Sequence, residues 1–111
     1  MSVTRVYCLD SYAIPELLQL LHTERGERIW LDTNTAASIT IKGQEFEIEG
    51  PALDEDAVEE LLRPVTDTRQ MRSLRKFGTV DIIYKFKGTK FLIRVVRAFG
   101  IFNVELQAIK A

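Results

Sequence analysis

The stretch TVDIIYKFKGTKFLIRVVRAFGIFNVELQAI, residues 79–109, decides the fold. It contains a Lys-Gly dipeptide at 87–88 and a Phe-Gly dipeptide at 99–100, and glycine supplies the positive φ angle that a tight hairpin needs. Apolar residues alternate with polar ones between these turns, for example at Val80, Ile82, Tyr84 and Phe86. Such alternation is typical of strands that bury one face. The stretch therefore predicts a meander of three antiparallel strands at 79–86, 89–98 and 101–109.

A second hairpin is predicted upstream, with strands at 38–41 and 45–49 joined by Lys42-Gly43. Its apolar positions alternate with polar ones, so we expect one face to be buried and the other to be exposed to solvent. The solvent-exposed face carries Glu45, Glu47 and Glu49. Residues 28–32 predict a further strand, and the β-rich residues Val3 to Leu9 predict a short edge strand or a docking arm.

Three helices are predicted from apolar spacing and capping signals. The first spans residues 13–24, with Pro15 in its first turn and Gly26 as its stop. The second runs to Leu62 from Asp54 as N-cap, and Leu53 and Val58 form a hydrophobic staple. The third follows Pro64: Asp67 and Gln70 cap its start, Met71 and Leu74 face inward, and it ends at Lys76 before Gly78.

These elements predict one α+β domain over residues 1–111, with three helices and a mainly antiparallel sheet of about six strands. The longest stretch without charge, residues 33–41, is far shorter than the roughly 20 apolar residues of a membrane-spanning helix. No signal-peptide pattern opens the chain. We therefore expect a cytoplasmic protein with no membrane span.

The chain lacks the residue patterns that catalysis and metal binding require. One cysteine, Cys8, excludes an internal disulfide, and one histidine, His22, leaves too few soft ligands for zinc. The six glycines are isolated, so no loop is present to cradle a nucleotide phosphate. His22 is the only imidazole base available to Cys8 or Ser11, and it is expected at a helix end. We therefore predict a protein that is not an enzyme and uses no cofactor.

Charge is unevenly distributed, although the net charge is only −1. Residues 1–62 hold four Lys and Arg against 13 Asp and Glu, and residues 63–111 hold 11 against three. Such a split is compatible with a nucleic-acid surface, with a self-complementary protein, or with two halves that neutralise each other inside one fold. Asp54, Glu55 and Asp56 form an acidic run at the start of the second predicted helix, where the helix dipole favours negative charge.

Basic residues of the third helix are the strongest charge feature. Either they form a solvated helix face, or they dock an acidic partner together with cations from the sheet. The candidate partner-binding residues are Arg69, Arg72, Arg75, Lys76, Arg94 and Arg97. Nucleic acid is disfavoured as the partner, because aromatic residues on these strands alternate like core residues and do not form a stacking platform.

From Pro15 to Ile109 the order of elements resembles the N-terminal domain of the PilT-type pilus-retraction ATPases, which are relatives of the type II secretion ATPases. The resemblance is carried by the leading helix with Pro15-Glu-Leu-Leu, by Ile29-Trp-Leu, and by Arg72-Ser-Leu-Arg-Lys-Phe-Gly-Thr-Val-Asp81. It also includes the strand Lys90-Phe-Leu-Ile-Arg94, where Phe91 sits like the phenylalanine of the family's Arg-Phe-Arg-Val strand. Lys90 and Leu92 stand where that strand has arginines.

This resemblance implies a PAS-like, non-catalytic domain that binds protein, either a motor ATPase, a motility or secretion component, or a copy of itself. In the family the domain packs against the RecA-like motor domain of the next subunit in a hexameric ring. Residues 1–111 contain no such motor domain. Two interpretations are open: a domain of a longer ATPase, or a free-standing adaptor in twitching motility or type II secretion. The alternative function is a PAS-like sensory domain that holds a small ligand between helices and sheet.

Overall fold

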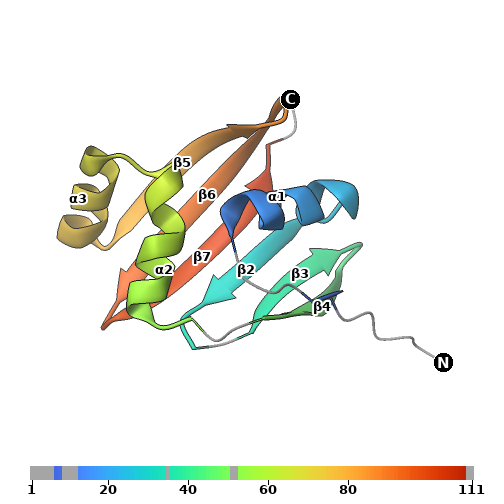
Figure 1. Cartoon of the computed structure of the whole chain (residues 1–111), viewed down its shortest axis with the longest axis horizontal. Coiled ribbons are helices and arrows are strands. Elements are labelled where there is room, and N and C mark those ends of the chain that lie inside the picture. The colour runs from blue at the N-terminus through green and yellow to red at the C-terminus, as the bar shows by residue number, and fades with distance from the viewer. Residues whose placement is uncertain (1–6, 9–12, 35, 51–52, 110–111) are drawn as a thin grey trace.

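The structure of the chain is a computed structural model that describes residues 7–8, 13–34, 36–50 and 53–109. Within these residues seven strands form one sheet in the order β1-β4-β3-β2-β7-β6-β5 (Figure 1). The strands are β1 (Tyr7–Cys8), β2 (Arg28–Asp32), β3 (Ala37–Ile41), β4 (Gln44–Glu49), β5 (Thr79–Phe86), β6 (Thr89–Ala98) and β7 (Ile101–Ala108). The helices are α1 (Ile14–Thr23), α2 (Glu55–Leu62), the 3-10 turn η1 (Arg63–Val65) and α3 (Thr68–Phe77).

The predicted α+β fold with a mainly antiparallel sheet is confirmed. Every strand pair is antiparallel except β1 with β4, where Tyr7 lies beside Ile48 in parallel register. Of the segment predicted as a strand from Val3 to Leu9, only Tyr7 and Cys8 lie within the described residues. β3 begins at Ala37, one residue before the predicted start of this strand, and the Ala37 side chain is buried opposite Ile48.

The hairpin turns adopt the backbone that their glycines require. Lys42 and Gly43 both have positive φ, as do Lys87 and Gly88 in the next hairpin. Two consecutive residues with positive φ match the right-handed twist of the strands that they join. The turn at 99–100 has the same geometry, so all three predicted hairpins are confirmed.

The helix caps also follow the sequence. The Asp54 side chain accepts a hydrogen bond from the backbone N–H of Ala57 at 2.8 Å. Leu53 and Val58, the predicted staple, are both buried. Pro64 ends α2 as predicted, but the chain continues directly into η1, where Pro64 occupies an early helical position that needs no N–H donor.

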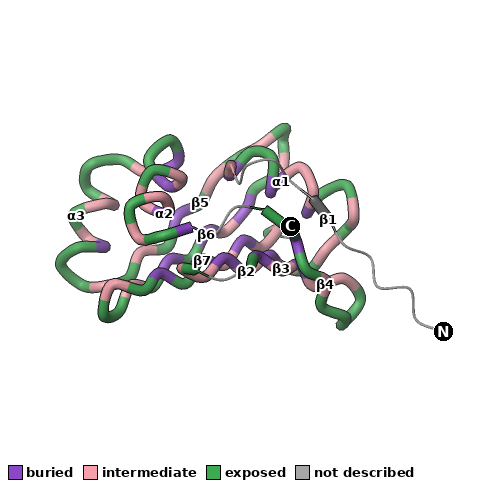
Figure 2. Tube along the Cα trace, turned by 60° about the horizontal axis from the view of Figure 1, so that its bottom comes forward, coloured by how far each residue is buried: buried purple, intermediate pink, exposed green. Residues whose placement is uncertain are grey.

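The three α-helices lie on one side of the sheet, as Figures 1 and 2 show. α1 packs against β2 and β7, α2 packs against β7, and α3 packs against β5 and β6 at the far end. The core between the layers contains Leu17, Leu18, Ile29, Phe91, Ile93 and Leu106, none of which is measurably exposed. Side chains on the other side of the strands form what we call the open face. It includes Arg28, Trp30, Glu45, Glu47, Ile83, Leu92 and Arg94.

The described residues include no helix long and apolar enough to cross a membrane.

Two glycines with the same backbone conformation give a stability test. Gly78 ends α3 at φ 77°, and Gly43 has φ 78° in the β3–β4 turn. A Cβ added at Gly78 would lie 2.9 Å from the backbone oxygen of Arg97, whereas one at Gly43 meets nothing within 4 Å. We expect Gly43→Ala to lower the free energy of unfolding by about 1 kcal/mol through the left-handed conformation alone. Gly78→Ala should lower the free energy of unfolding by more, because the backbone at Gly78 or Arg97 must also move. Urea denaturation measures both changes, and equal losses of stability in the two variants would contradict the close approach of Gly78 to Arg97.

Candidate protein-docking surface at helix α3

Helix α3 is held in place at both of its ends. The Asp67 carboxylate accepts a hydrogen bond from the Gln70 backbone N–H at 2.7 Å, and the Gln70 side chain accepts one from the Asp67 N–H at 2.9 Å. At the other end Gly78 donates its backbone N–H to the Leu74 carbonyl. Leu74 is the fully buried residue of α3, and Met71 is only half-buried. Most of this helix therefore faces solvent.

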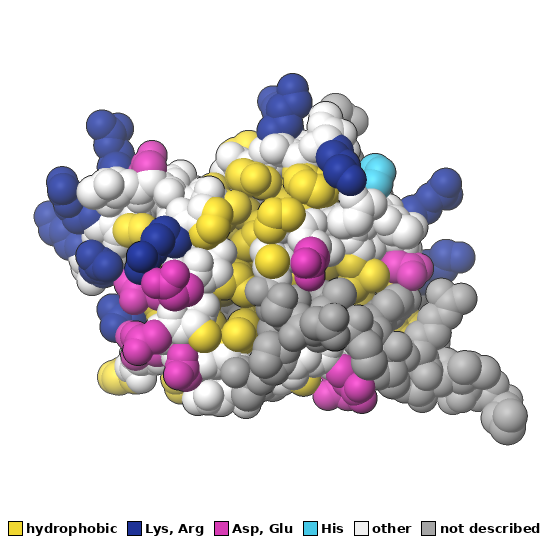
Figure 3. All heavy atoms as spheres, viewed as in Figure 1, with side chains coloured by type: hydrophobic (Ala, Val, Ile, Leu, Met, Phe, Trp, Pro, Cys, Tyr) yellow, Lys and Arg dark blue, Asp and Glu magenta, His cyan; other side chains and the backbone are white. Residues whose placement is uncertain are grey.

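Two arginines on the outer side of α3 are available for a partner. Arg69 and Arg72 are exposed, and neither has an ion-pair partner among the described residues. Lys76 is also exposed, with its Nζ 5.3 Å from the ring centroid of Phe77. Figure 3 shows Lys and Arg side chains gathered over α3, next to the acidic side chains of α2.

The structure gives two of the predicted partner-binding cations an internal role. The Nη2 atom of Arg75 lies 3.1 Å from Oε1 of Glu59, and the Arg97 guanidinium forms an ion pair with the Glu55 carboxylate. Both cations therefore contact carboxylates of α2. The Arg97 guanidinium also lies 5.6 Å from the ring centroid of Phe102. The acidic first half and the basic second half therefore neutralise each other in part inside the fold.

Arg94 lies on a different surface. It belongs to the open face of the sheet, where its Nε is 3.2 Å from an oxygen of Asp81. Both side chains are about half exposed, so this pair contributes little to stability. Arg97 is three residues further on and faces the helices, because an odd separation along a strand reverses the side. The six candidate residues consequently fall on three separate parts of the molecule.

A shallow hollow of about 400 Å³ lies between η1 and the start of α3. Arg63, Arg72 and Arg75 line it, with Met71 and Thr66 among the residues between them. Arg63 was not among the sequence candidates, since it precedes Pro64 and had no helical neighbour to group it with. The Nη2 atom of Arg63 lies 2.9 Å from Oε1 of Glu60, but both side chains are about two-thirds exposed to solvent.

Exposed apolar side chains lie at the end of the sheet that is next to α3. Phe99 is fully exposed, Phe77 is 69% exposed and Ile101 is 51% exposed. They lie near one another because Arg97 donates its backbone N–H to the Gly78 carbonyl at 2.7 Å, and because Ala98 pairs with Ile101. The sequence contained a signal for Phe99, since a tight hairpin turn favours Asn, Asp or Gly over an aromatic residue. We call Arg69, Arg72, Lys76, Phe77 and Phe99 the α3 docking surface.

Two larger hollows among the described residues lie away from α3. One of about 920 Å³ opens where α1 ends, between His22, Arg25, Arg28 and Ile109. The other, of about 440 Å³, lies on the open face beside Trp30, Asp32 and Glu47. Among the described residues no group of three or more His, Cys, Asp and Glu side chains is placed to hold a metal ion. Ser11 and the Cys8 side chain, the sequence candidates for a nucleophile, lie outside the described residues.

Comparison with known proteins identifies the fold. No family model matches the sequence, and no curated protein is similar to it. The structure of the pilus retraction motor PilT with bound ADP matches 91% of this chain with a TM-score of 0.75 and 20% identity. The ATPase DotB of Legionella pneumophila matches 96% with a TM-score of 0.76 and 12% identity. The chain covers only 30% and 33% of those chains, about a third of their length.

This likeness fits the N-terminal domain of such ATPases, and the α+β fold is consistent with a PAS-like domain. The motor domain is not part of the match. Lys90 and Leu92, the two positions where the family was expected to carry arginines, both lie on the open face on either side of buried Phe91.

Asp32 gives a pH-dependent prediction. Burial raises the pKa of its carboxyl group, whose Oδ1 has no hydrogen-bond partner among the described residues. Since the pKa is higher in the folded than in the unfolded chain, the protein takes up a proton on folding between the two values, and this contribution to stability grows as pH falls. We therefore expect Asp32→Asn to raise the free energy of unfolding at pH 7, with the gain disappearing at pH values below both pKa values. Urea denaturation over that range measures it, and a gain that persists in acid would contradict the assignment.

Proposed function

We propose that this chain is a non-catalytic protein-interaction domain that binds a component of a motility or secretion machine driven by a PilT-type ATPase. The observation that carries this proposal is a fold shared along nine-tenths of the chain with a third of two such ATPases, on a sequence without a phosphate-binding loop. The partner is either the motor ATPase itself, another component of the machine, or a second copy.

The α3 docking surface supports a protein partner. Aromatic residues and arginine are enriched at protein interfaces, and a few anchors near the centre supply most of the binding energy. Phe77 and Phe99 are exposed aromatics, and Arg69 and Arg72, on the same helix as Phe77, are exposed cations with no ion-pair partner among the described residues. A partner that fits has an apolar pocket for a phenylalanine ring and carboxylates around it.

Nucleic acid fits this surface less well. Glu55 and Glu59 of α2 pair with Arg97 and Arg75 immediately behind α3, so the local positive potential is reduced. Affinity for nucleic acid depends on how many phosphates the protein neutralises. An acidic protein surface can bind through fewer cations. Arg69 and Arg72, which have no ion-pair partner among the described residues, would contact its carboxylates, and the exposed rings of Phe77 and Phe99 would contact its apolar part.

A small ligand between helices and sheet is the weaker alternative. Leu17, Leu18 and Phe91 occupy the layer where a PAS-like domain holds its ligand, and none of them is measurably exposed. A ligand in this layer would have to displace close-packed side chains, which costs several kcal/mol. The geometry therefore favours a protein partner.

The first prediction of this proposal concerns nucleotide. We expect the purified chain neither to hydrolyse ATP nor to bind it tightly, because it has no loop of backbone amides to hold the phosphates. Isothermal titration calorimetry with Mg-ATP and a phosphate-release assay measure the two activities. Magnesium-dependent turnover that co-purifies with the chain and changes with substitutions in it would contradict the proposal.

The second prediction concerns the α3 docking surface. The tagged chain, expressed in its own cell, should co-purify an ATPase motor subunit or another motility or secretion protein, and the two purified proteins should bind directly. We expect Arg69→Glu with Arg72→Glu, and separately Phe99→Ser, each to weaken this binding about tenfold or more. All three side chains are exposed, so unfolding by heat should be unchanged.

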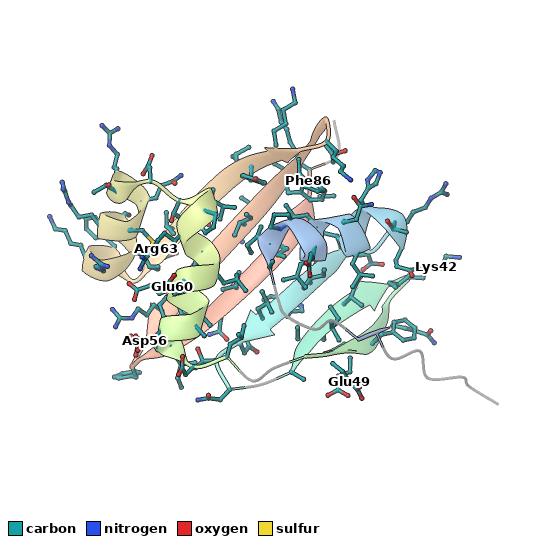
Figure 4. All side chains as sticks on the ribbon, viewed as in Figure 1. Lys42, Glu49, Asp56, Glu60, Arg63 and Phe86 are labelled. Carbon is teal, nitrogen blue, oxygen red and sulfur yellow. The ribbon has the colours of Figure 1, made fainter. Side chains whose placement is uncertain are left out.

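Matched controls are available at the opposite end of the molecule. Arg25→Glu with Lys42→Glu makes the same change in net charge, and Figure 4 shows Lys42 far from α3. Ile109→Ser removes a partly exposed apolar residue away from α3. If these controls weaken binding as much as the α3 variants do, the docking surface is wrong. If the partner belongs to neither motility nor secretion, the proposed process is wrong.

A further inference from the structure

Strand β5 forms one edge of the sheet, and this edge is a surface separate from the α3 docking surface. The strand pairs with β6 from Thr79 to Phe86, and no strand that the structure describes lies on its other side (Figure 1). A long edge strand presents unpaired backbone N–H and C=O groups to any further strand. β5 contains no proline, and its unbroken register with β6 leaves no bulge. Nothing in the strand itself therefore prevents a further strand from pairing with it.

The hydrogen-bond pattern shows which residues of β5 carry the unpaired backbone groups. Arg97 donates its backbone N–H to the Gly78 carbonyl, so these two residues form a bonded pair at the start of the β5–β6 ladder. Bonded pairs recur at every second residue of an antiparallel ladder, so the even-numbered residues of β5 bond to β6. The odd-numbered residues direct their backbone groups to the free edge, and these are Thr79, Asp81, Ile83 and Lys85.

The outward-directed residues of β5 are self-complementary about Ile83. With two copies of the strand antiparallel and Ile83 opposite Ile83, Asp81 of each copy lies opposite Lys85 of the other. A shift of two residues in either direction places one of these charges opposite Ile83, and a shift of four places like charges opposite each other. Opposite charges stabilise a cross-strand pair, and like charges destabilise it. Charge therefore selects one register for two copies of β5.

Lys85 needs a counter-charge that its own chain does not supply. It lies opposite Lys90 of β6, and neither lysine has an ion-pair partner among the described residues. Two like charges in directly opposed positions destabilise a sheet. Asp81 is 3.2 Å from Nε of Arg94, but the Asp81 side chain is still about half exposed and open to a second cation. Asp81 of a second copy would therefore relieve the repulsion between Lys85 and Lys90.

Apolar side chains of β5 match in the same register. Ile83 is 60% exposed and lies opposite the half-buried Leu92 of β6, so two copies would form one apolar row across four strands. On the helix side of the sheet the register pairs Val80 of one copy with Phe86 of the other, and both are only partly buried in the single chain. An aromatic residue opposite a β-branched one is a favourable cross-strand pair. A second copy would therefore bury apolar surface on both sides of the joined sheet.

We propose that two copies of this chain associate through β5 as a closed two-fold dimer, with the strands antiparallel and Ile83 at the axis. The two sheets then join into one, and the helices of both copies lie on the same side of it. Ile83 with Ile83, and Asp81 with Lys85 twice, are the directly opposed pairs that exchange backbone hydrogen bonds. A two-fold contact uses the β5 edge of both copies, so association stops at two.

The small size of this interface sets the strength of the dimer. It consists of one strand from each copy, which is less than the roughly 800 Å² per partner of a typical stable interface. The dimer is therefore reversible, with a dissociation constant on the order of 10 to 100 μM. It weakens as salt screens the pairs of Asp81 with Lys85.

Sedimentation equilibrium of the full chain over about 5 to 500 μM tests the proposal. Lys85→Asp places a carboxylate opposite Asp81 of the other copy, so we expect a monomer. Within one chain the same change replaces the repulsion with Lys90 by an attraction, so the fold is not weakened. Asp81→Lys places two cations opposite each other and should also give a monomer. The double variant Asp81→Lys with Lys85→Asp restores opposite charges in the same register and should dimerise again.

Amide hydrogen exchange locates the interface in the unchanged chain. The backbone N–H groups of Asp81, Ile83 and Lys85 should exchange several-fold more slowly at about 500 μM than at about 5 μM, because only the dimer bonds them. Ile82 and Tyr84 bond to β6 in monomer and dimer alike, so their amides are the internal reference. Equal exchange of Ile83 at both concentrations would overturn the proposal.

Control variants separate this dimer from the α3 docking surface, on which it does not rest. Arg69→Glu with Arg72→Glu, and Lys42→Asp in the β3–β4 turn, both lie outside β5 and should leave the dimer intact. The dimer is wrong if the wild-type chain stays monomeric at about 500 μM and low salt, if it survives Lys85→Asp, or if the double variant stays monomeric. Species larger than a dimer would also overturn it, because they require contact between β5 and a different edge.

Discussion

The whole arrangement depends on a sheet that is covered by helices on one side only. Side chains alternate along every strand, so one residue set faces the helices and the next faces away. The inward set is large and apolar, and Ile29, Phe91 and Leu106 show how fully α1 and its neighbours cover it. The outward set is left to solvent or to a partner. The three α-helices that the structure describes all lie on the other side, so none of them covers this set of residues.

Local chemistry made much of the fold predictable from the sequence. Caps such as Asp67 with Gln70, and turns such as Lys42-Gly43, depend on residues a few positions apart, and the structure confirms them. The placement of β2 next to β7 was not predictable in this way. Arg28 pairs with Gln107, and nothing in either segment specifies a partner so distant in sequence. The position of α3 beside β5 is local by contrast, because α3 ends at Phe77 and β5 begins at Thr79.

The candidate site was predictable to a smaller degree. The exposure of Arg69 and Arg72 followed from helical spacing, and it is seen in the structure. The internal ion pairs of Arg75 and Arg97 could not be foreseen, because α2 meets α3 and the end of β6 only in the folded chain. The separation of Arg94 from Arg97 was already contained in the two-residue period of a strand. Arg63 lines the hollow beside Arg72 only because of η1, a turn that sequence patterns predict poorly.

The pairing of β2 with β7 also sets the order in which this protein is built. The meander of β5, β6 and β7 consists of neighbouring hairpins, so it forms through short-range closure. The strands β2, β3 and β4 are synthesised before this meander, and β2 can pair with β3 while its other edge has no partner until β7 has been synthesised. Meanwhile β2 exposes a free edge and the apolar side chains of Ile29 and Leu31. Until β7 is available, the unpaired edge of β2 is therefore the part of the sheet that is most open to pairing with another chain.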